Sequence, residues 1–391
     1  MFANFPFIVA ALALAIWIYL IAGRGGFWLA SRYDDLALPP SAMAQWPRVN
    51  VVIPARDEAA SIGDCIRSIL SQPYPGELSV ILIDDQSRDG TAEIAVEAAA
   101  SIQASHRLTI LPGQALPSGW TGKLWAVKQG LSLIESRLLH PDYVLLTDAD
   151  ILYSGDAVMR LVARAERDRL VMTSVMARLN CESWPEKFLI PAFIFFFSMI
   201  YPFSWVRDPE RSTAAAAGGC LLARWDALQN AGGIESIRGA LIDDCALGAR
   251  LKLQGRVWLG FSQDVRSVRA SDTVEDIGRM ISRSAYAQLR YSPLILFGTI
   301  AAMVLLYIAP VYLALFGEGT NRLFGVVSWC LMALAFQPTL RYYRQSPLWG
   351  VFLPVIASAY MVFTINSAIQ YKRGRGGMWK GRAQAQASRA Q

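Results

Sequence analysis

Long uncharged stretches at both ends of the chain constrain its fold more than any other feature. Residues 2 to 23 carry no charged side chain, and further uncharged stretches lie at 294 to 316, 323 to 340 and 347 to 371. Each approaches the ~20 residues that a helix needs to cross a ~30 Å hydrocarbon core. Charged residues make up only 17% of the chain, against ~25% in a typical soluble domain. We therefore expect a membrane protein with an N-terminal anchor at 1–24 and a transmembrane region at 294–371.

The orientation of these stretches follows from the basic residues beside them. The N-terminal stretch lacks the basic start of a cleaved signal peptide, and Arg24 and Arg32 follow it, so the next segment is expected in the cytoplasm. Three C-terminal crossings, however, would put the basic tail 372–391 outside. Either one stretch does not cross, with the short 323 to 340 as the favoured candidate, or the tail is an exception to the positive-inside rule.

The region 47–270 has the pattern of an α/β domain. A linker with Pro39, Pro40 and Pro47 precedes it. Apolar strands are predicted at 49–53, 78–83, 107–111 and 143–147, alternating with helices at 59–70, 91–100 and 122–138. Such alternation is typical of a Rossmann-like, mostly parallel sheet.

The apolar segment 188–206 lies inside this domain and is interrupted by Pro191 and Pro202. A full crossing would place the carboxylates before and after it on opposite faces of the membrane. We therefore expect a helix in the membrane interface, where an apolar acceptor can move along it. The alternative is a buried core helix.

Polar residues follow three of the predicted strands, at the sheet edge where open α/β domains bind ligands. These sites are Pro54 to Glu58, Asp84 to Thr91, and Asp148-Ala149-Asp150. We interpret Asp89-Gly90-Thr91 as the turn and cap of helix 91–100. Asp148 and Asp150 are different, because two like charges one residue apart repel unless a cation offsets them. Mg²⁺ or Mn²⁺, completed by substrate phosphates, would do so, and the pair predicts a clamp for a diphosphate.

Other residue types exclude several classes of site. The five cysteines form no C-x-x-C pair, and their odd number argues for a reducing compartment rather than a disulfide framework. His106 and His140 have no partner at metal-ligand spacing. The net charge of +6 comes from basic residues near apolar stretches, which favours a membrane over a nucleic acid as partner.

Together these motifs, with Gly122-Lys123, resemble the family-2 glycosyltransferases in order and spacing. The resemblance implies a GT-A fold, a nucleotide-sugar donor, a divalent metal and inversion of the anomeric centre. It further implies a donor site in which Lys123 lies near the sugar nucleotide, Asp148 borders the nucleoside pocket, Asp150 holds Mg²⁺ or Mn²⁺, and the pocket is lined by Pro54, Ala55, Arg56, Glu58 and Asp85.

The same resemblance covers two later motifs. Ile242-Asp243-Asp244-Cys245 is similar to the acidic pair that starts a late helix of the family, which makes Asp244 the candidate base for the acceptor hydroxyl. The alternative is that the two aspartates only cap that helix. Gly218-Gly219-Cys220 is similar to the family's small-residue turn, and Gly219 is expected to let donor and acceptor approach closely.

Residues 273–292 predict an amphipathic interface helix, with apolar residues such as Ile277 on one face and arginines on another. Arg283, Gln288 and Arg290 are candidates for contacts with the departing diphosphate or with anionic lipids, although a solvated basic face explains the arginines equally well. Gln288-Leu289-Arg290-Tyr291 is one residue shorter than the Q-x-x-R-W motif of processive family members and has Tyr for Trp. This departure argues against polymer synthesis.

This last motif, the Asp243-Asp244 pair and Trp379-Lys380-Gly381-Arg382 together resemble the hopene-associated glycosyltransferases, relatives of the ceramide glucosyltransferases. The resemblance implies a bacterial inner-membrane enzyme of hopanoid or other isoprenoid lipid synthesis. We expect transfer of a hexose from a UDP-linked donor to a lipid hydroxyl at the cytoplasmic face. The alternatives are a processive polysaccharide synthase and a non-catalytic nucleotide-sensing scaffold; a transporter is disfavoured because the apolar stretches contain no ionisable groups.

Overall fold

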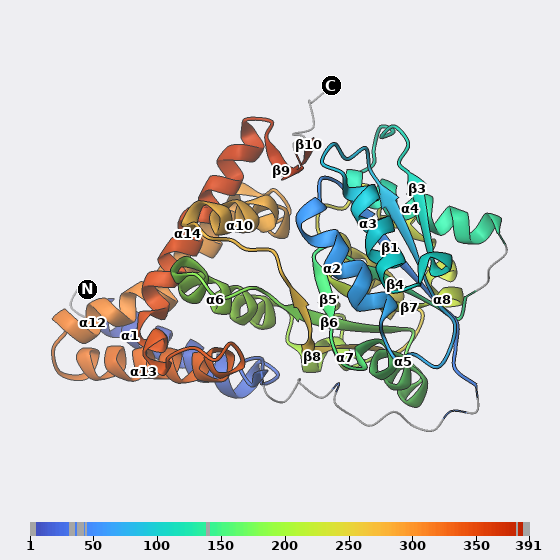
Figure 1. Cartoon of the computed structure of the whole chain (residues 1–391). Helices are drawn as coiled ribbons and strands as arrows, with labels where there is room; N and C mark the ends of the chain where they lie inside the picture. The colour runs from blue at the N-terminus through green and yellow to red at the C-terminus, as the bar shows by residue number, and fades with distance from the viewer. Residues whose placement is uncertain are drawn as a thin grey trace.

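A sheet domain and a group of apolar helices lie side by side in the computed structural model (Figure 1). The structure describes residues 5–30, 36, 43, 45–137, 141–380 and 382–385. Predictions that involve Arg32, His140 and the linker prolines Pro39 and Pro40 fall outside these residues.

Eight strands form the sheet, in the order β3-β2-β1-β4-β7-β6-β8-β5. The strands are β1 (Val49–Ala55), β2 (Leu78–Asp84), β3 (Leu108–Pro112), β4 (Tyr143–Thr147), β5 (Ile151–Tyr153), β6 (Met172–Arg178), β7 (Cys220–Arg224) and β8 (Val257–Ser267). Only β7 and β5 run against their neighbours, so the predicted mostly parallel, GT-A-like sheet is confirmed. Every residue of β1 and β4 is buried, because helices cover both faces of the central strands.

Helices α2 (Ala59–Leu70), α3 (Thr91–Ser101), α4 (Gly122–Ser136) and α5 (Ala157–Asp168) alternate with these strands. Their hydrophobic spacing explains their packing, since Ile62, Ile66 and Ile69 of α2 are fully buried against the sheet. The predicted turn before α3 also forms: Gly90 has φ of 84°, and Asp89 accepts a hydrogen bond from the Thr91 amide. The later part of the domain contains the short elements α7 (Phe203–Arg207), α8 (Trp225–Asn230) and η4 (Ile234–Ile237), and helix α9 (Asp243–Lys252).

The apolar segment inside the domain forms helix α6 (Trp184–Ile200), which lies between the sheet and the C-terminal helices (Figure 1). Ser183 and Glu186 make a capping box at its start. Leu189 and Phe195 are buried on it, whereas Trp184 at its start is 61% exposed. The helix therefore has both a packed side and an exposed end, and its place in the membrane interface stays a prediction.

Within the described residues, four helical segments are long and apolar enough to cross a membrane: Phe5–Gly23, Pro293–Phe316, Gly319–Tyr342 and Pro347–Lys372. The first is α1 and the third is α13. The second contains α11 (Pro293–Met303), the π-helical turn η5 (Val304–Ile308) and α12 (Ala309–Phe316), and the fourth contains the 3₁₀ turn η6 (Pro347–Phe352) and α14 (Leu353–Lys372). One N-terminal and two to three C-terminal transmembrane helices were expected, and the structure has one N-terminal and three C-terminal apolar helical segments among the described residues.

The amphipathic helix is α10 (Val274–Gln288), capped by Thr273 and Asp276. It packs lengthwise on α14, and a hairpin of β9 (Gly376–Trp379) and β10 (Arg382–Ala385) follows α14 (Figure 1). This hairpin reaches back to the carboxyl-end edge of the sheet.

Candidate active site

The carboxyl ends of β1 and β2 bring the first two polar motifs together. Ala55 pairs with Asp84 in register, and the Asp85 amide donates to the Ala55 carbonyl at 2.8 Å. Arg56 lies over this junction, because its Nη1 donates to the Asp85 carbonyl at 2.6 Å and is 3.6 Å from Asp85 Oδ2. Asp85 is 1% exposed. Pro54 lines the neighbouring cavity.

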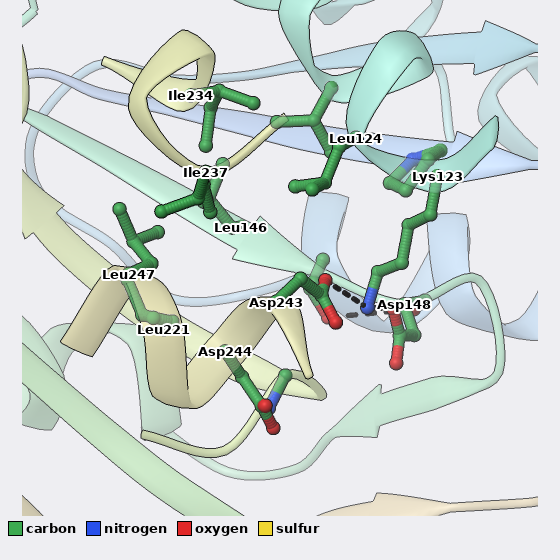
Figure 2. A pocket seen from close by; sticks show the side chains of 14 residues that line it. Lys123, Leu124, Leu146, Asp148, Leu221, Ile234, Ile237, Asp243, Asp244 and Leu247 are labelled. Carbon is green, nitrogen blue, oxygen red and sulfur yellow. Dashed lines mark hydrogen bonds and ion pairs between the residues drawn. The ribbon is translucent and has the colours of Figure 1, made fainter. Parts of the chain in front are cut away.

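Lys123 joins the motif after β4 to the acidic pair at the start of α9. Its Nζ is 2.8 Å from Asp148 Oδ1 and 3.2 Å from Asp243 Oδ2 (Figure 2). The Thr121 side chain caps α4 and so sets where Lys123 emerges from that helix. Burial alone lowers the pKa of Lys123, but the charges of Asp148 and Asp243 outweigh it and raise the pKa above its ordinary value. The lysine is therefore a fixed positive charge between two acidic motifs.

Asp150 has a different set of partners. Its Oδ2 accepts hydrogen bonds from Ser267 Oγ at 2.6 Å and Arg269 Nε at 3.2 Å. Arg269 Nη2 also donates to both carboxylate oxygens of Glu58, at 2.7 and 2.9 Å. Glu58 and Asp150, which come from different strand ends, are thus bridged by one guanidinium group.

A second cation reaches Glu58 from the C-terminal hairpin. Lys380 Nζ is 2.9 Å from Glu58 Oε1 and donates to the Asp57 carbonyl at 2.9 Å. Sequence reasoning missed Arg269, which carries no motif signal. Lys380 was noted only as part of the closing motif Trp379 to Arg382, without a role at the site.

Asp244 lies on the other side of Lys123 and is held by backbone groups. Its Oδ2 accepts from the Gly218 amide at 2.9 Å and its Oδ1 from the Cys245 amide at 2.8 Å. Burial and the neighbouring charge of Asp243 raise the pKa of Asp244 to about 6, although Lys123 opposes the rise. Helix α9 begins at Asp243 and its N-cap residue, Ile242, makes no side-chain cap, so the capping alternative is reduced to the bond from the Cys245 amide in the first turn. The carboxyl group also has the pKa of a general base for neutral pH.

The glycine turn is shaped by these charged groups. A Cβ on Gly218 would lie 3.3 Å from Lys123 Nζ and 3.4 Å from Asp244 Oδ2. Gly219 instead faces the sheet: its carbonyl accepts from Thr147 Oγ1 at 2.8 Å, and a Cβ there would meet Ile151 at 3.0 Å. Gly218 is thus the glycine that borders the charged groups.

A small cavity opens between these groups, with a volume of about 30 Å³. Lys123, Asp148, Asp243 and Asp244 line one side of it, and aliphatic side chains such as Leu247 line the other (Figure 2). Small-molecule sites commonly measure ~300 to 1,000 Å³. The enclosed space beside the acidic groups is therefore smaller than a typical small-molecule site.

The charges around the site favour a cation. Five carboxylates, those of Glu58, Asp148, Asp150, Asp243 and Asp244, face three cationic side chains, those of Lys123, Arg269 and Lys380. Two formal negative charges are left over. No group of three or more His, Cys, Asp or Glu side chains among the described residues is placed to hold a metal by itself. The residues fit a divalent ion that takes one or two carboxylates and is completed by phosphate oxygens.

The remaining candidates lie on or after α10. Gln288 exchanges hydrogen bonds with the Tyr201 hydroxyl at 2.7 and 2.9 Å. Arg283 and Arg290 are exposed, and no bond within the described residues joins them to Asp150 or Asp244. Their contact with a diphosphate or with lipid stays a prediction.

Comparison with known proteins agrees with this geometry. A protein-family model described as "Glycosyltransferase like family 2" matches residues 47–273. An N-acetylglucosaminyltransferase of Mesorhizobium japonicum is 28% identical over 149 residues, which cover 37% of this chain and 32% of that protein. A beta-monoglucosyldiacylglycerol synthase of Trichormus variabilis is 29% identical over 125 residues, which cover 32% of this chain and 25% of that protein. The matches thus span a third or less of these relatives.

A solved structure extends the likeness in fold to the whole chain. The mannosyltransferase PcManGT of Pyrobaculum calidifontis, solved with GDP-Man and Mn²⁺, has a TM-score of 0.50 and 18% identity. The likeness covers 95% of this chain and 100% of that one. The sheet, the strand-end motifs and the match over more than half of the sequence lead to one conclusion: the chain belongs to the family-2-like glycosyltransferases.

Proposed function

We propose that this protein transfers a hexose from a nucleoside diphosphate sugar to the hydroxyl of a lipid, with inversion at the anomeric carbon. The observation that carries the proposal is the position of Lys123 between Asp148 and the Asp243-Asp244 pair. Lys123 thus connects the end of the site proposed for the metal and the diphosphate with the end proposed for the general base. A reaction in one displacement step requires both.

On the donor side, Pro54, Ala55, Arg56, Glu58 and Asp85 form the proposed nucleoside pocket. Arg56 Nε is buried and has no hydrogen-bond partner within the described residues. Buried donors are normally satisfied, so this N–H is available for a ligand. We propose a UDP-linked sugar as donor.

The metal end would be built on Asp150, with Asp148 beside it. A divalent cation held by these residues would supply positive charge to the departing diphosphate. Arg269 holds Asp150 Oδ2, so a metal ion at this carboxylate would either take its other oxygen or displace the guanidinium group. Its bonds to Glu58 keep it at the site.

The base end consists of Asp244. The acceptor oxygen attacks the anomeric carbon on the face opposite the diphosphate, the bond from that carbon to the diphosphate oxygen breaks, and the acceptor proton passes to the Asp244 carboxylate. With a pKa of about 6, Asp244 is ionised at neutral pH and basic enough to accept that proton. The amides of Gly218 and Cys245 fix its orientation.

A lipid acceptor is supported by the four apolar helical segments that adjoin the catalytic domain. It also agrees with the relative from Trichormus variabilis, whose name describes synthesis of a glycolipid. The resemblance to the hopene-associated enzymes supports a hopanoid or other isoprenoid lipid, at the cytoplasmic face of a bacterial inner membrane. Arg24, directly after α1, and Lys380 of the tail both lie beside the catalytic domain, which supports that orientation.

The test is to incubate purified protein with membrane lipid extract and a panel of labelled sugar nucleotides, with and without Mn²⁺, and to identify the products by mass spectrometry. We expect one metal-dependent glycolipid, which Asp150→Ala does not form. Soluble or polymeric product alone would reject the lipid acceptor, and the polymer would indicate the processive alternative.

A further inference from the structure

The C-terminal tail lies on the catalytic domain, which limits how the chain can cross the membrane. Lys380 is bonded to Glu58 and to the Asp57 carbonyl, both after β1. The chain therefore enters the apolar region at Pro293 and leaves it on the same side. The number of crossings in between must be even, yet three apolar helical segments lie there.

Helices α1 and α13 extend over the same depth, so α13 crosses the membrane if α1 does. We call the end of this depth that lies away from the catalytic domain the outer level. At the end away from the catalytic domain, the rings of Phe7 and Phe324 lie 5.9 Å apart. At the other end, Arg24 Nε donates to the Met199 carbonyl of α6 at 2.8 Å, and the Tyr342 hydroxyl donates to the Ser262 carbonyl of β8 at 2.8 Å. Both helices thus run from the outer level to the catalytic domain.

The segment α11 to α12 leads from the catalytic side to that outer level. A Cβ on Gly325, near the start of α13, would lie 2.6 Å from the Ala314 nitrogen and 2.7 Å from the Pro310 oxygen of α12. The end of α12 and the start of α13 are therefore in close contact, joined by the short turn at Gly317 and Glu318. These two segments make the even pair of crossings.

The chain after α13 turns back along that helix. Gln337 Nε2 donates to the Pro347 carbonyl at 3.1 Å, and Trp329 Nε1 donates to the Val351 carbonyl at 3.0 Å. Trp329 precedes Tyr342 by 13 residues, so at ~1.5 Å per residue Val351 lies ~20 Å below the catalytic end of α13. Phe324, at the outer level, is another ~8 Å away. The turn enters the membrane without reaching its far side.

This turn has the features that irregular backbone needs at membrane depth, where every polar group must be satisfied within the protein. The side chains of Gln337 and Trp329 bind carbonyls that the break between α13 and α14 leaves free. Gly350 permits the contact, since a Cβ there would lie 2.8 Å from the Ala333 oxygen and would also meet the Gln337 amide.

Helix α14 then returns to the catalytic side along the amphipathic helix. Ser282 Oγ of α10 donates to the Phe363 carbonyl at 2.9 Å, and the Tyr286 amide donates to Ser367 Oγ at 3.0 Å. In Figure 1, α14 runs steeply across the direction of α13. Its exposed side chains include Val355 and Val362, at 56% and 62%, which suits a face against lipid.

We propose that residues 346–372 form a re-entrant hairpin, which enters the membrane from the catalytic side, turns near Phe352 and leaves on the same side. The partner of its exposed face is the hydrocarbon of that leaflet. The apolar stretch that does not cross is therefore 347 to 371, and the expected candidate, 323 to 340, crosses. The basic flanks Arg24, Arg341 and Lys372 then lie on the catalytic side, in keeping with the positive-inside rule, and Arg322 near the outer turn is the exception among them.

The hairpin is tested by adding one cysteine at a time and labelling it with a membrane-impermeant maleimide in right-side-out and inside-out vesicles. The background carries Cys181→Ser and Cys330→Ser, because these two native cysteines are not buried. We expect Glu318→Cys to react only from the outer side, Gln345→Cys and Arg373→Cys only from the catalytic side, and Phe352→Cys from neither. Reaction of Arg373→Cys or Phe352→Cys from the outer side, or of Gln345→Cys from that side, would overturn the proposal.

A second pair of variants tests the packing of the hairpin. Gly350→Leu should push η6 off α13 and make Phe352→Cys reactive from the catalytic side. Gly298→Leu is the matched control, because a Cβ at Gly298 meets nothing within 4 Å. Equal labelling of Phe352→Cys in both backgrounds would contradict close packing at Gly350. None of these readouts depends on transferase activity, so failure here is separate from failure of the proposed reaction.

Discussion

The site contains two clusters around a cation, one at Lys123 and one at Arg269, and the two cations differ in their exposure and in the carboxylates they contact. Lys123 is 22% exposed and contacts one carboxylate on each side, Asp148 and Asp243. Arg269 is 48% exposed and contacts Asp150, the expected metal residue. The difference suggests two roles: Lys123 is a permanent counter-ion, whereas Arg269 holds the place of a cation that arrives with the donor.

The largest expected effect is at Asp150, because it is the only residue assigned to the metal. Asp150→Ala should abolish both transfer and Mn²⁺-dependent donor binding, measured by calorimetry with UDP and the other nucleoside diphosphates. Ser267→Ala removes a hydrogen bond to the same carboxylate and an acceptor for the Arg269 amide but no metal ligand, so as the control it should retain both. Normal donor binding by Asp150→Ala would mean that residues other than Asp150 hold the metal.

At the base end, Asp244→Asn should lower turnover by ~10² to 10⁴, the usual contribution of a general base, and leave donor binding with Mn²⁺ intact. The Gly218 and Cys245 amides donate to different oxygens of Asp244, so Asn keeps an acceptor for one of them, and intact donor binding is the control that the loop persists. Near-normal turnover would leave Asp244 as a helix cap only.

Lys123→Met should reduce turnover by about tenfold or more, because it leaves Asp148 and Asp243 without their shared cation. Lys128→Met is a matched control on the same helix: Lys128 is 21% exposed and pairs with Glu235 and Glu135, away from the acidic edge. Asp243→Asn added to Lys123→Met should restore part of the activity. Equal losses in the two lysine variants would mean that Lys123 acts only through the stability of α4.

The pH dependence of turnover reports the pKa of Asp244, which depends on the charges around it. A base must be ionised, so with its pKa raised to about 6, turnover should fall as pH drops through about 6 rather than near 4. Asp243→Asn removes a charge that raises this pKa and should shift the acidic limb to lower pH. A limb that does not move would assign the titration to another group.

The smallest expected effect is at Arg269. Arg269→Gln removes the internal cation from Asp150 and should lower the Mn²⁺ concentration for half-maximal donor binding about two- to fivefold, as expected of a partly exposed ion pair. Arg266→Gln, at an exposed arginine of β8, the strand that precedes Arg269, is the control. A higher Mn²⁺ requirement in Arg269→Gln would show that Arg269 helps to bind the donor rather than holding the place of its metal.

The two clusters also show how far the sequence predicts the site. Asp148 belongs to a short motif directly after an apolar strand, and Lys123 belongs to a short motif at the start of a predicted helix. The parallel pairing of the strands brings the motifs that follow them to one edge. Arg269 and Lys380 could not be assigned, because they meet Glu58 across 211 and 322 positions of sequence through contacts with no local pattern.

The membrane region shows the same limit. Length and hydropathy predicted its helical segments correctly, but a re-entrant segment has the same composition as a crossing one. What distinguishes them is tertiary: the bonds from Gln337 and Trp329 to the turn, and the return of the tail to Asp57.

The central claim is that this site, with a divalent metal ion, transfers one hexose from a nucleoside diphosphate sugar to one lipid molecule. It is tested most directly by measuring released nucleoside diphosphate and glycolipid together, in lipid nanodiscs with the donor found in the panel. The account predicts equal amounts of the two, one sugar per lipid, with Mn²⁺ present and neither without it. Nucleoside diphosphate release without glycolipid, or a chain of sugars on each acceptor, would contradict it.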